Sequence, residues 1–352
     1  MSKQELRLSV VKTDTVLRIE GRLYHLRMRA IADSTQMLSA VTGGIVGEAY
    51  AADDDFASTK KVRGPEGHYS ITLTDSAGRQ VFRREFRKAD FYRLVGPDIA
   101  VVAEPEPAVF LGYYPELGGL AFWQSIGIPQ SDVGDYLFLL LDLRGQVLEL
   151  SLSNSWGSGR VDCSPAPAPN GQALLTCATL LRPGRPPLSL EKPKANLMLA
   201  RFLNDSTLLT LYAYGETHYE YEADSTVKSM DFVEPSQMRR VPNAFLTTVR
   251  GSKVASFRYN GAWDLLGYFV PRTYVHSLHT YYLLDENRGL RLIDKHDPAA
   301  TREVGFQQMT RFTPPQQPRE VRFRVQSEMA AFDFFADQDN PERLRYRKSS
   351  NE

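Results

Sequence analysis

The segment YGETHYEYEAD, residues 214–224, is the part of this sequence richest in groups that could do chemistry. In an extended strand successive side chains alternate between two faces, so four of its polar side chains would share one face and its tyrosines the other. These four are Glu216, His218, Glu220 and Glu222. An imidazole among carboxylates can bind a divalent cation or raise the pKa of one carboxylate for acid–base catalysis. The pattern is more typical of a solvated outer face with tyrosines packed inward, so we assign no metal to the segment. It is still the best candidate site in the sequence.

Aromatic side chains beside glycine-rich turns give a second hint of binding. Flat rings near loop tips suit stacking on sugars or anchoring a protein partner. Aromatic residues are also common inside sheets, and packing in the core is the favoured interpretation. The tryptophans concerned are Trp123, Trp156 and Trp263.

Other arrangements of reactive residues are weaker. His276 and His279 lie three apart among strand-favouring neighbours, which predicts opposite faces and argues against a shared metal ion. His296 stands alone and is expected to be a surface residue or a hydrogen-bonded structural one. The sequence lacks HExxH, Walker-type loops, a GxSxG elbow and paired-cysteine metal spacings. We therefore predict no cofactor and assign no catalytic residue.

Composition limits the class of protein. The chain has 352 residues, of which 42% are hydrophobic, so it has enough apolar side chains for a folded core. Lysine plus arginine equals aspartate plus glutamate at 42 each, which makes nucleic acid a poor candidate partner. No apolar run reaches the roughly 18 residues of a membrane-spanning helix, so we predict no transmembrane segment.

The sequence predicts that β-hairpins position these residues. Five pairs of short alternating or apolar runs are joined by turns that begin near residues 75, 142, 204, 250 and 285. The predicted fold class is therefore all-β: two β-sheet domains, either sandwiches or barrel-like hairpin meanders. An irregular β-propeller is the alternative, because the uneven spacing of the turns argues against a regular one.

Period-two alternation also predicts which side chains enter the core. In the first hairpin we expect the apolar members of one face to be buried; they are Tyr69, Ile71 and Leu73. In the second hairpin we expect three leucines of its return strand to point inward; they are Leu148, Leu150 and Leu152.

A proline-rich stretch, residues 164–193, marks a change in composition that a central strand would not tolerate. We place a domain boundary beside it. The expected parts are an N-terminal β-domain over 1–155, a C-terminal β-domain over 156–340, and a charged, frayed tail over 341–352.

The two cysteines, Cys163 and Cys177, flank a Pro/Gly turn. Their spacing suits a disulfide that closes a hairpin, worth about 3 kcal/mol in an oxidising compartment. Two separate buried thiols are equally compatible with the sequence.

The run GHYSITLTDSAGRQVFRREFRKADFYRLV, residues 67–95, carries a resemblance. It contains a short strand, a turn ending in glycine, a Val-Phe strand and an F-x-K-x-x-F pattern, which is formed here by Phe86, Lys88 and Phe91. This series resembles an uncharacterised bacterial lipoprotein family that is defined only as a domain of unknown function. The likeness extends over about residues 20–152. It implies an envelope-facing β-domain and no particular activity. The family's leader and lipid-bearing cysteine are not seen near Met1, so we expect a periplasmic or envelope-facing protein if a leader has been removed, and otherwise a cytoplasmic one.

Three functional hypotheses follow. The preferred one is a non-enzymatic, β-rich binding or scaffold protein of the bacterial envelope, with a protein or glycan partner. The second is a glycan-active hydrolase or lyase using acidic residues such as Glu216, Glu220 and Asp224, since such enzymes need only two suitably separated carboxylates. The third is a β-propeller that docks proteins. None of them assigns an oligomeric state.

Overall fold

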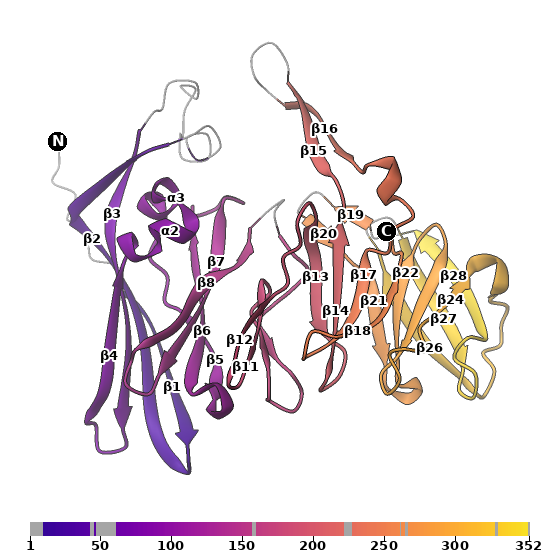
Figure 1. Cartoon of the computed structure of the whole chain (residues 1–352), viewed down its shortest axis with the longest axis horizontal. Coiled ribbons are helices and arrows are strands. Elements are labelled where there is room, and N and C mark those ends of the chain that lie inside the picture. The colour runs from indigo at the N-terminus through magenta and orange to yellow at the C-terminus, as the bar shows by residue number, and fades with distance from the viewer. Residues whose placement is uncertain are drawn as a thin grey trace. The chain divides into compact units, whose positions relative to one another are not determined.

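Strands dominate the computed structural model, which confirms the all-β prediction. No described helix is longer than six residues. The chain divides into two compact units. The first comprises 1–159 with 164–166 and 183–185, and the second comprises the rest (Figure 1). The structure describes residues 10–42, 46, 61–156, 160–221, 227–260, 262–264, 267–327 and 330–350.

The first unit contains two four-stranded antiparallel sheets, each a simple meander in chain order. The first sheet consists of β1 (Val10–Ile19), β2 (Arg22–Val41), β3 (Lys61–Asp75) and β4 (Gln80–Arg87). Three short helical segments follow: η2 (Lys88–Phe91), α2 (Tyr92–Val95) and α3 (Pro97–Val102). The second sheet consists of β5 (Val109–Tyr114), β6 (Gly119–Gly127), β7 (Gly134–Asp142) and β8 (Val147–Ser155), with η3 (Pro115–Leu117) between β5 and β6.

One hydrophobic core joins these two sheets. Tyr69, Ile71 and Leu73 are at most 3% exposed, and they share this core with Leu139 and Leu141 of β7. The predicted inward face of the first hairpin is therefore confirmed. The predicted turns at residues 75–78 and 142–145 also join paired strands, β3 with β4 and β7 with β8.

The prediction for the leucines of β8 is wrong in two of three cases. Leu148 and Leu152 are 47% and 38% exposed, and only Leu150 packs against the core. Leu152 pairs with Leu137 in register with the Leu139–Leu150 pair, so it lies on the face of Leu150, and the pairing does not explain its exposure. Leu148 is exposed because of a β-bulge: Leu141 pairs with Val147 and Leu140 with Glu149, so Leu148 is an extra residue in the ladder. An inserted residue reverses the alternation of side chains, which turns Val147 rather than Leu148 toward the core.

The second unit continues with sheets of four strands. The first contains β9 (Ala166–Pro167), β10 (Leu174–Leu175), β11 (Thr179–Arg182) and β12 (Arg185–Ser189). The next contains β13 (Asn196–Phe202), β14 (Thr207–Ala213), β17 (Ala244–Thr248) and β18 (Lys253–Phe257). The third contains β21 (Arg272–Val275), β22 (Thr280–Asp285), β23 (Gly289–Asp294) and β24 (Arg302–Gly305). The last contains β25 (Thr310–Arg311), β26 (Glu320–Gln326), β27 (Ala330–Asp337) and β28 (Leu344–Ser350).

Two hairpins and three 3-10 turns lie between these strands. They are β15 (Glu216–Tyr221) with β16 (Val227–Val233), β19 (Ala262–Asp264) with β20 (Gly267–Phe269), and η5 (Ser236–Met238), η6 (His276–Leu278) and η7 (Phe306–Gln308).

Successive sheets of this unit pack face to face. Strand β22 shows how: Tyr282 and Leu284 enter a core shared with Phe334 of β27, whereas Leu283 enters the core shared with Leu211 of β14. Strands buried on both faces explain the apolar runs in the sequence. Four-stranded sheets that stack one after another are typical of propeller blades, and the strands here pair antiparallel except for the short β25, so this organisation favours the irregular-propeller alternative over a sandwich or barrel.

The expected frayed tail is also wrong. Strand β28 pairs with β27 over its whole length and also carries the short parallel strand β25. Leu344 and Tyr346 are buried in the last core, while Arg345 between them and Arg347 after them lie on the opposite face of the strand.

Two further findings concern the cysteines and the membrane. Cys163 and Cys177 form a disulfide, with a Cα–Cα distance of 5.7 Å, inside the core between the third and fourth sheets of the chain. Among the described residues, no helix combines the length and the hydrophobicity needed to cross a bilayer.

Candidate functional site

The best candidate segment of the sequence forms one strand of the hairpin β15–β16, which extends away from the sheets of the second unit (Figure 1). The hairpin is inserted between β14 and β17, which pair directly with each other. Its register sets His218 opposite Asp231 and Glu220 opposite Ser229. Within the described part of the chain, β15 and β16 pair only with each other.

The predicted site residues of this hairpin are only partly brought together. His218 and Glu220 are exposed, and alternation along β15 places them on one face, whereas the side chain of Glu216 is not described. Glu222 and Asp224 lie outside the described residues. The exposed side chains fit a solvated binding face rather than an enclosed catalytic cleft. No group of three or more His, Cys, Asp or Glu side chains could hold a metal ion in the described segments.

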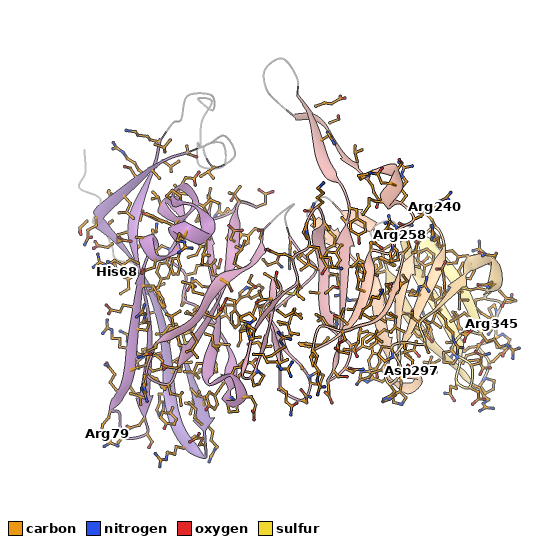
Figure 2. The ribbon with its side chains drawn as sticks, in the orientation of Figure 1. His68, Arg79, Arg240, Arg258, Asp297 and Arg345 are labelled. Atoms are coloured by element: carbon orange, nitrogen blue, oxygen red, sulfur yellow. A yellow bond between two sulfur atoms is a disulfide. The ribbon has the colours of Figure 1, made fainter. Side chains whose placement is uncertain are left out.

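The foot of the hairpin is clamped by Arg258, which sequence reasoning missed. Its Nη2 donates to Oε2 of Glu234 at 2.7 Å, and its Nη1 donates to the carbonyl oxygens of Met238 and Val241 at 3.3 and 3.4 Å. The Arg258 and Glu234 side chains are only 17% and 18% exposed. Figure 2 shows Arg258 on the side of the unit from which the hairpin extends. This guanidinium therefore fixes the return segment that follows β16.

A buried asparagine secures the same region from the sheet side. Nδ2 of Asn243 donates to the carbonyl oxygens of Tyr212 and Tyr259, at 3.0 and 2.8 Å, and its Oδ1 accepts from Tyr259 N at 2.8 Å. Tyr259 is 3% exposed, so it belongs to the core and not to a binding platform. A lone Asn before a strand gives no sequence signal of this bridging role.

Two of the three candidate tryptophans lie in one aromatic cluster of the first unit. The ring of Tyr136 lies between them, 4.3 Å from that of Trp123 and 5.8 Å from that of Trp156. The Trp156 indole packs on Gly127 and Gly134, where a Cβ atom would come within 3 Å of the ring. Both indole nitrogens are buried, and neither has a hydrogen-bond partner among the described residues. Such packing favours the core interpretation. Trp263 lies in β19 of the other unit, and its side chain is not described.

The histidines differ from the prediction. His276 lies in the 3-10 turn η6 and His279 ends that turn in a left-handed conformation with φ of 48°, so neither is in a strand. The turn brings the His279 ring 4.8 Å from that of His296, which the sequence left isolated. Two imidazole rings alone are too few to predict a metal site.

Lys88, the lysine of the F-x-K-x-x-F pattern, is completely buried. Its Nζ donates to the carbonyl oxygen of Val101 at 2.6 Å, which ties α3 to the start of η2, directly after β4. Burial lowers the pKa of Lys88 to about 8, while the attraction of Glu66 opposes this shift. The stacked rings of Phe86 and Phe91, 6.0 Å apart, complete the pattern. An amine with this pKa could act as a nucleophile, but its burial makes the role structural.

An open groove in the first unit has a volume of about 470 Å³. The segment 104–110 lines one side of it, and Thr13 and Met28 belong to the strands on the other. Glu104 and Glu106 give it an acidic rim. The repeated Glu-Pro sequence of this segment is its only sequence signal.

Comparisons with known proteins leave the family open. No family model matches the chain, and no curated protein matches it. Among solved structures, the chain is similar to BamB from Moraxella catarrhalis, with 10% identity over 94% of each chain and a TM-score of 0.20. A score this low carries no argument about function.

Proposed function

We propose that the chain is a non-enzymatic binding protein of the bacterial envelope that docks a protein partner through the β15–β16 hairpin. The observation that carries this proposal is the hairpin itself: it extends from a sheet that is complete without it, and Arg258 clamps its foot. A two-stranded ribbon is marginally stable alone, so a rigid foot is useful when the ribbon must present a surface.

The chemistry of the hairpin suits a protein partner. Its two outer edges carry backbone N–H and C=O groups that can pair with an added strand. His218 and Glu220 supply exposed polar contacts beside them. Val233, at the foot, is 50% exposed and adds an apolar contact.

The proposed compartment rests on two observations. The Cys163–Cys177 disulfide is expected in an oxidising environment such as the periplasm. The resemblance of residues 67–95 to a bacterial lipoprotein family points to the same location.

The test is site-specific photo-crosslinking in the cells that make the protein. A photoreactive residue in place of Glu220, or of His218, should give a discrete protein adduct. The same residue at Arg79, an exposed turn position of the first unit, is the control and should give no such adduct.

A second variant tests the foot. Arg258→Met should lower the yield of the Glu220 adduct because the hairpin loses its fixed direction, whereas Arg79→Met should leave it unchanged. Adducts that form equally at Glu220 and Arg79, or only at Arg79, would contradict the proposal. Circular dichroism of each variant verifies that the sheets remain folded.

A further inference from the structure

The outer face of the last sheet carries three arginines around one buried carboxylate. We call Arg322, Arg324 and Arg347, with Asp333 between them, the arginine face. Asp333 lies on the central strand β27, and the register sets it directly opposite Arg324 on β26 and Arg347 on β28. Alternation along all three strands turns these side chains away from the core that holds Phe334.

The carboxylate orients all three guanidinium groups. Arg324 donates to both oxygens of Asp333 at 3.0 and 3.1 Å, Arg347 donates at 2.7 Å, and Arg322 donates at 3.1 Å. Asp333 is 2% exposed, whereas the three arginine side chains are 50–54% exposed. The three guanidinium groups therefore cover the Asp333 carboxylate, and their outer surfaces remain open to solvent.

Among the residues that the structure describes, the arginine face has an excess of positive charge. One carboxylate balances only one of the three guanidinium groups, and the four hydrogen bonds use a minority of their N–H donors. The neighbouring arginine does not add to the excess, because Arg345 is paired with Glu320, Nε to Oε1 at 2.6 Å. Arg345, labelled in Figure 2, also lies over the ring of Phe312, with its Cζ 4.8 Å from the ring centre.

The geometry points to an anion with several carboxylates. Guanidinium groups bind carboxylates with two parallel hydrogen bonds, as Arg324 already does with Asp333. Arg322 and Arg324 are two residues apart on one strand, a separation of about 7 Å. Alternate side chains of an extended peptide have the same spacing. The net charge of the chain is zero, so no general positive field favours nucleic acid.

We propose that the arginine face binds an extended, carboxylate-rich segment of a partner protein. Asp333 holds the guanidinium groups in place before binding, which reduces the entropy lost when the acidic segment docks. This proposal rests on a different surface from the hairpin β15–β16, so each can fail without the other.

The experiment measures fluorescence anisotropy of a labelled oligoglutamate peptide with the full chain. Binding is expected, and it should weaken as salt is added because the contacts are exposed. The double variant Arg322→Gln/Arg347→Gln keeps the two-point Arg324–Asp333 pair and should weaken binding by about tenfold or more. The control, Arg79→Gln/Arg83→Gln, removes two exposed arginines of the first unit and should bind as the unmodified chain does.

Three results would overturn the proposal. The peptide could fail to bind, or the arginine-face variant could bind as well as the control. Alternatively, phosphatidylglycerol vesicles or duplex DNA could displace the labelled peptide at a lower concentration of anionic groups than unlabelled oligoglutamate needs. That result would show that the arginine face prefers phosphate groups to carboxylates. Matching thermal unfolding curves for the two double variants verify that the difference lies in the binding surface.

Discussion

Arg324 holds Asp333 across two neighbouring strands by two hydrogen bonds, from Nε to Oδ1 at 3.0 Å and from Nη2 to Oδ2 at 3.1 Å. The hydrogen bonds of Arg324, Arg347 and Arg322 together hold the pKa of the Asp333 carboxyl far below its usual range, against the opposing effect of burial. Removing this charge leaves the guanidinium groups close together without a counter-ion.

Asp333→Asn should therefore destabilise the chain by about 2 kcal/mol at neutral pH, measured as the free energy of unfolding in urea. Because the folded pKa is depressed, the contribution of Asp333 is full above its unfolded pKa of about 4 and is lost as the pH falls below that value. The difference between the two proteins should shrink at pH 3. Asp297→Asn, at an exposed position, is the control. A difference that stays constant with pH would show that the lost stability is not electrostatic.

Lys88 predicts a dependence on pH of the same sign, at higher pH, because its folded pKa is also depressed. Its folded pKa of about 8 lies below the ordinary value of 10.5, so the unfolded chain binds the proton more tightly between these two values. The free energy of unfolding should gain up to about 1.4 kcal/mol per pH unit from this group as the pH rises from 8 to 10.5.

Lys88→Met should remove this gain, which is measured as the difference between the two proteins in urea denaturation at several pH values. Lys253→Met replaces an exposed lysine and should keep the slope of the unmodified protein. Parallel pH profiles for the unmodified chain and the Lys88 variant would refute the depressed pKa.

The sequence predicted the strands well because a pleated strand makes alternation visible, as at Tyr69, Ile71 and Leu73. It could not reveal the bulge at Leu148, because Val147 and Leu148 are both apolar and either could face the core. The arginine face was also missed. Its members come from three strands, and only the pairing of β26, β27 and β28 brings them together.

The error over the C-terminal segment has a simple physical reason. Residues 341–352 are densely charged, which suggested a solvated tail. Leu344 and Tyr346 nevertheless alternate with arginines, and this alternation is the pattern of a strand with one buried face. Periodicity was the better guide here than composition.

At the candidate site, too, local sequence patterns reveal the exposed face of a strand but not the long-range contacts that hold it. Alternation correctly indicated an exposed polar face at His218 and Glu220. The clamp formed by Arg258 and Glu234 joins residues 24 positions apart, and no local pattern marks such a pair. Long-range ion pairs of this kind become visible only when the strands are paired.

Trp156 and Gly127 provide a test of packing. A Cβ atom on Gly127 would lie 2.6 Å from two atoms of the Trp156 ring, so Gly127→Ala must displace the indole. We expect a loss of about 1–3 kcal/mol in unfolding free energy and a change in tryptophan emission. Gly78→Ala, at a turn with φ of 79° and no neighbour within 4 Å, should strain the backbone without altering the emission. An emission change that persists in a Trp156→Phe background would assign it to another tryptophan and contradict the prediction.

The Cys163–Cys177 disulfide should stabilise the second unit. It closes a loop with a sequence separation of 14, and the restricted unfolded chain contributes about 3 kcal/mol. Cys163→Ser/Cys177→Ser should therefore lower the Tm of the second unit by roughly 6–12 °C in calorimetry. A reducing agent should cause a similar drop in the unmodified protein and none in the double variant.

The side chains around the bond, including Leu175, Leu180 and Phe202, form an apolar core, so part of the loss in the serine variant comes from buried hydroxyl groups without partners. Cys163→Ala/Cys177→Ala separates the two causes: it should lose the contribution of the cross-link alone, and a Tm equal to that of the unmodified protein would show that the cross-link itself adds no stability.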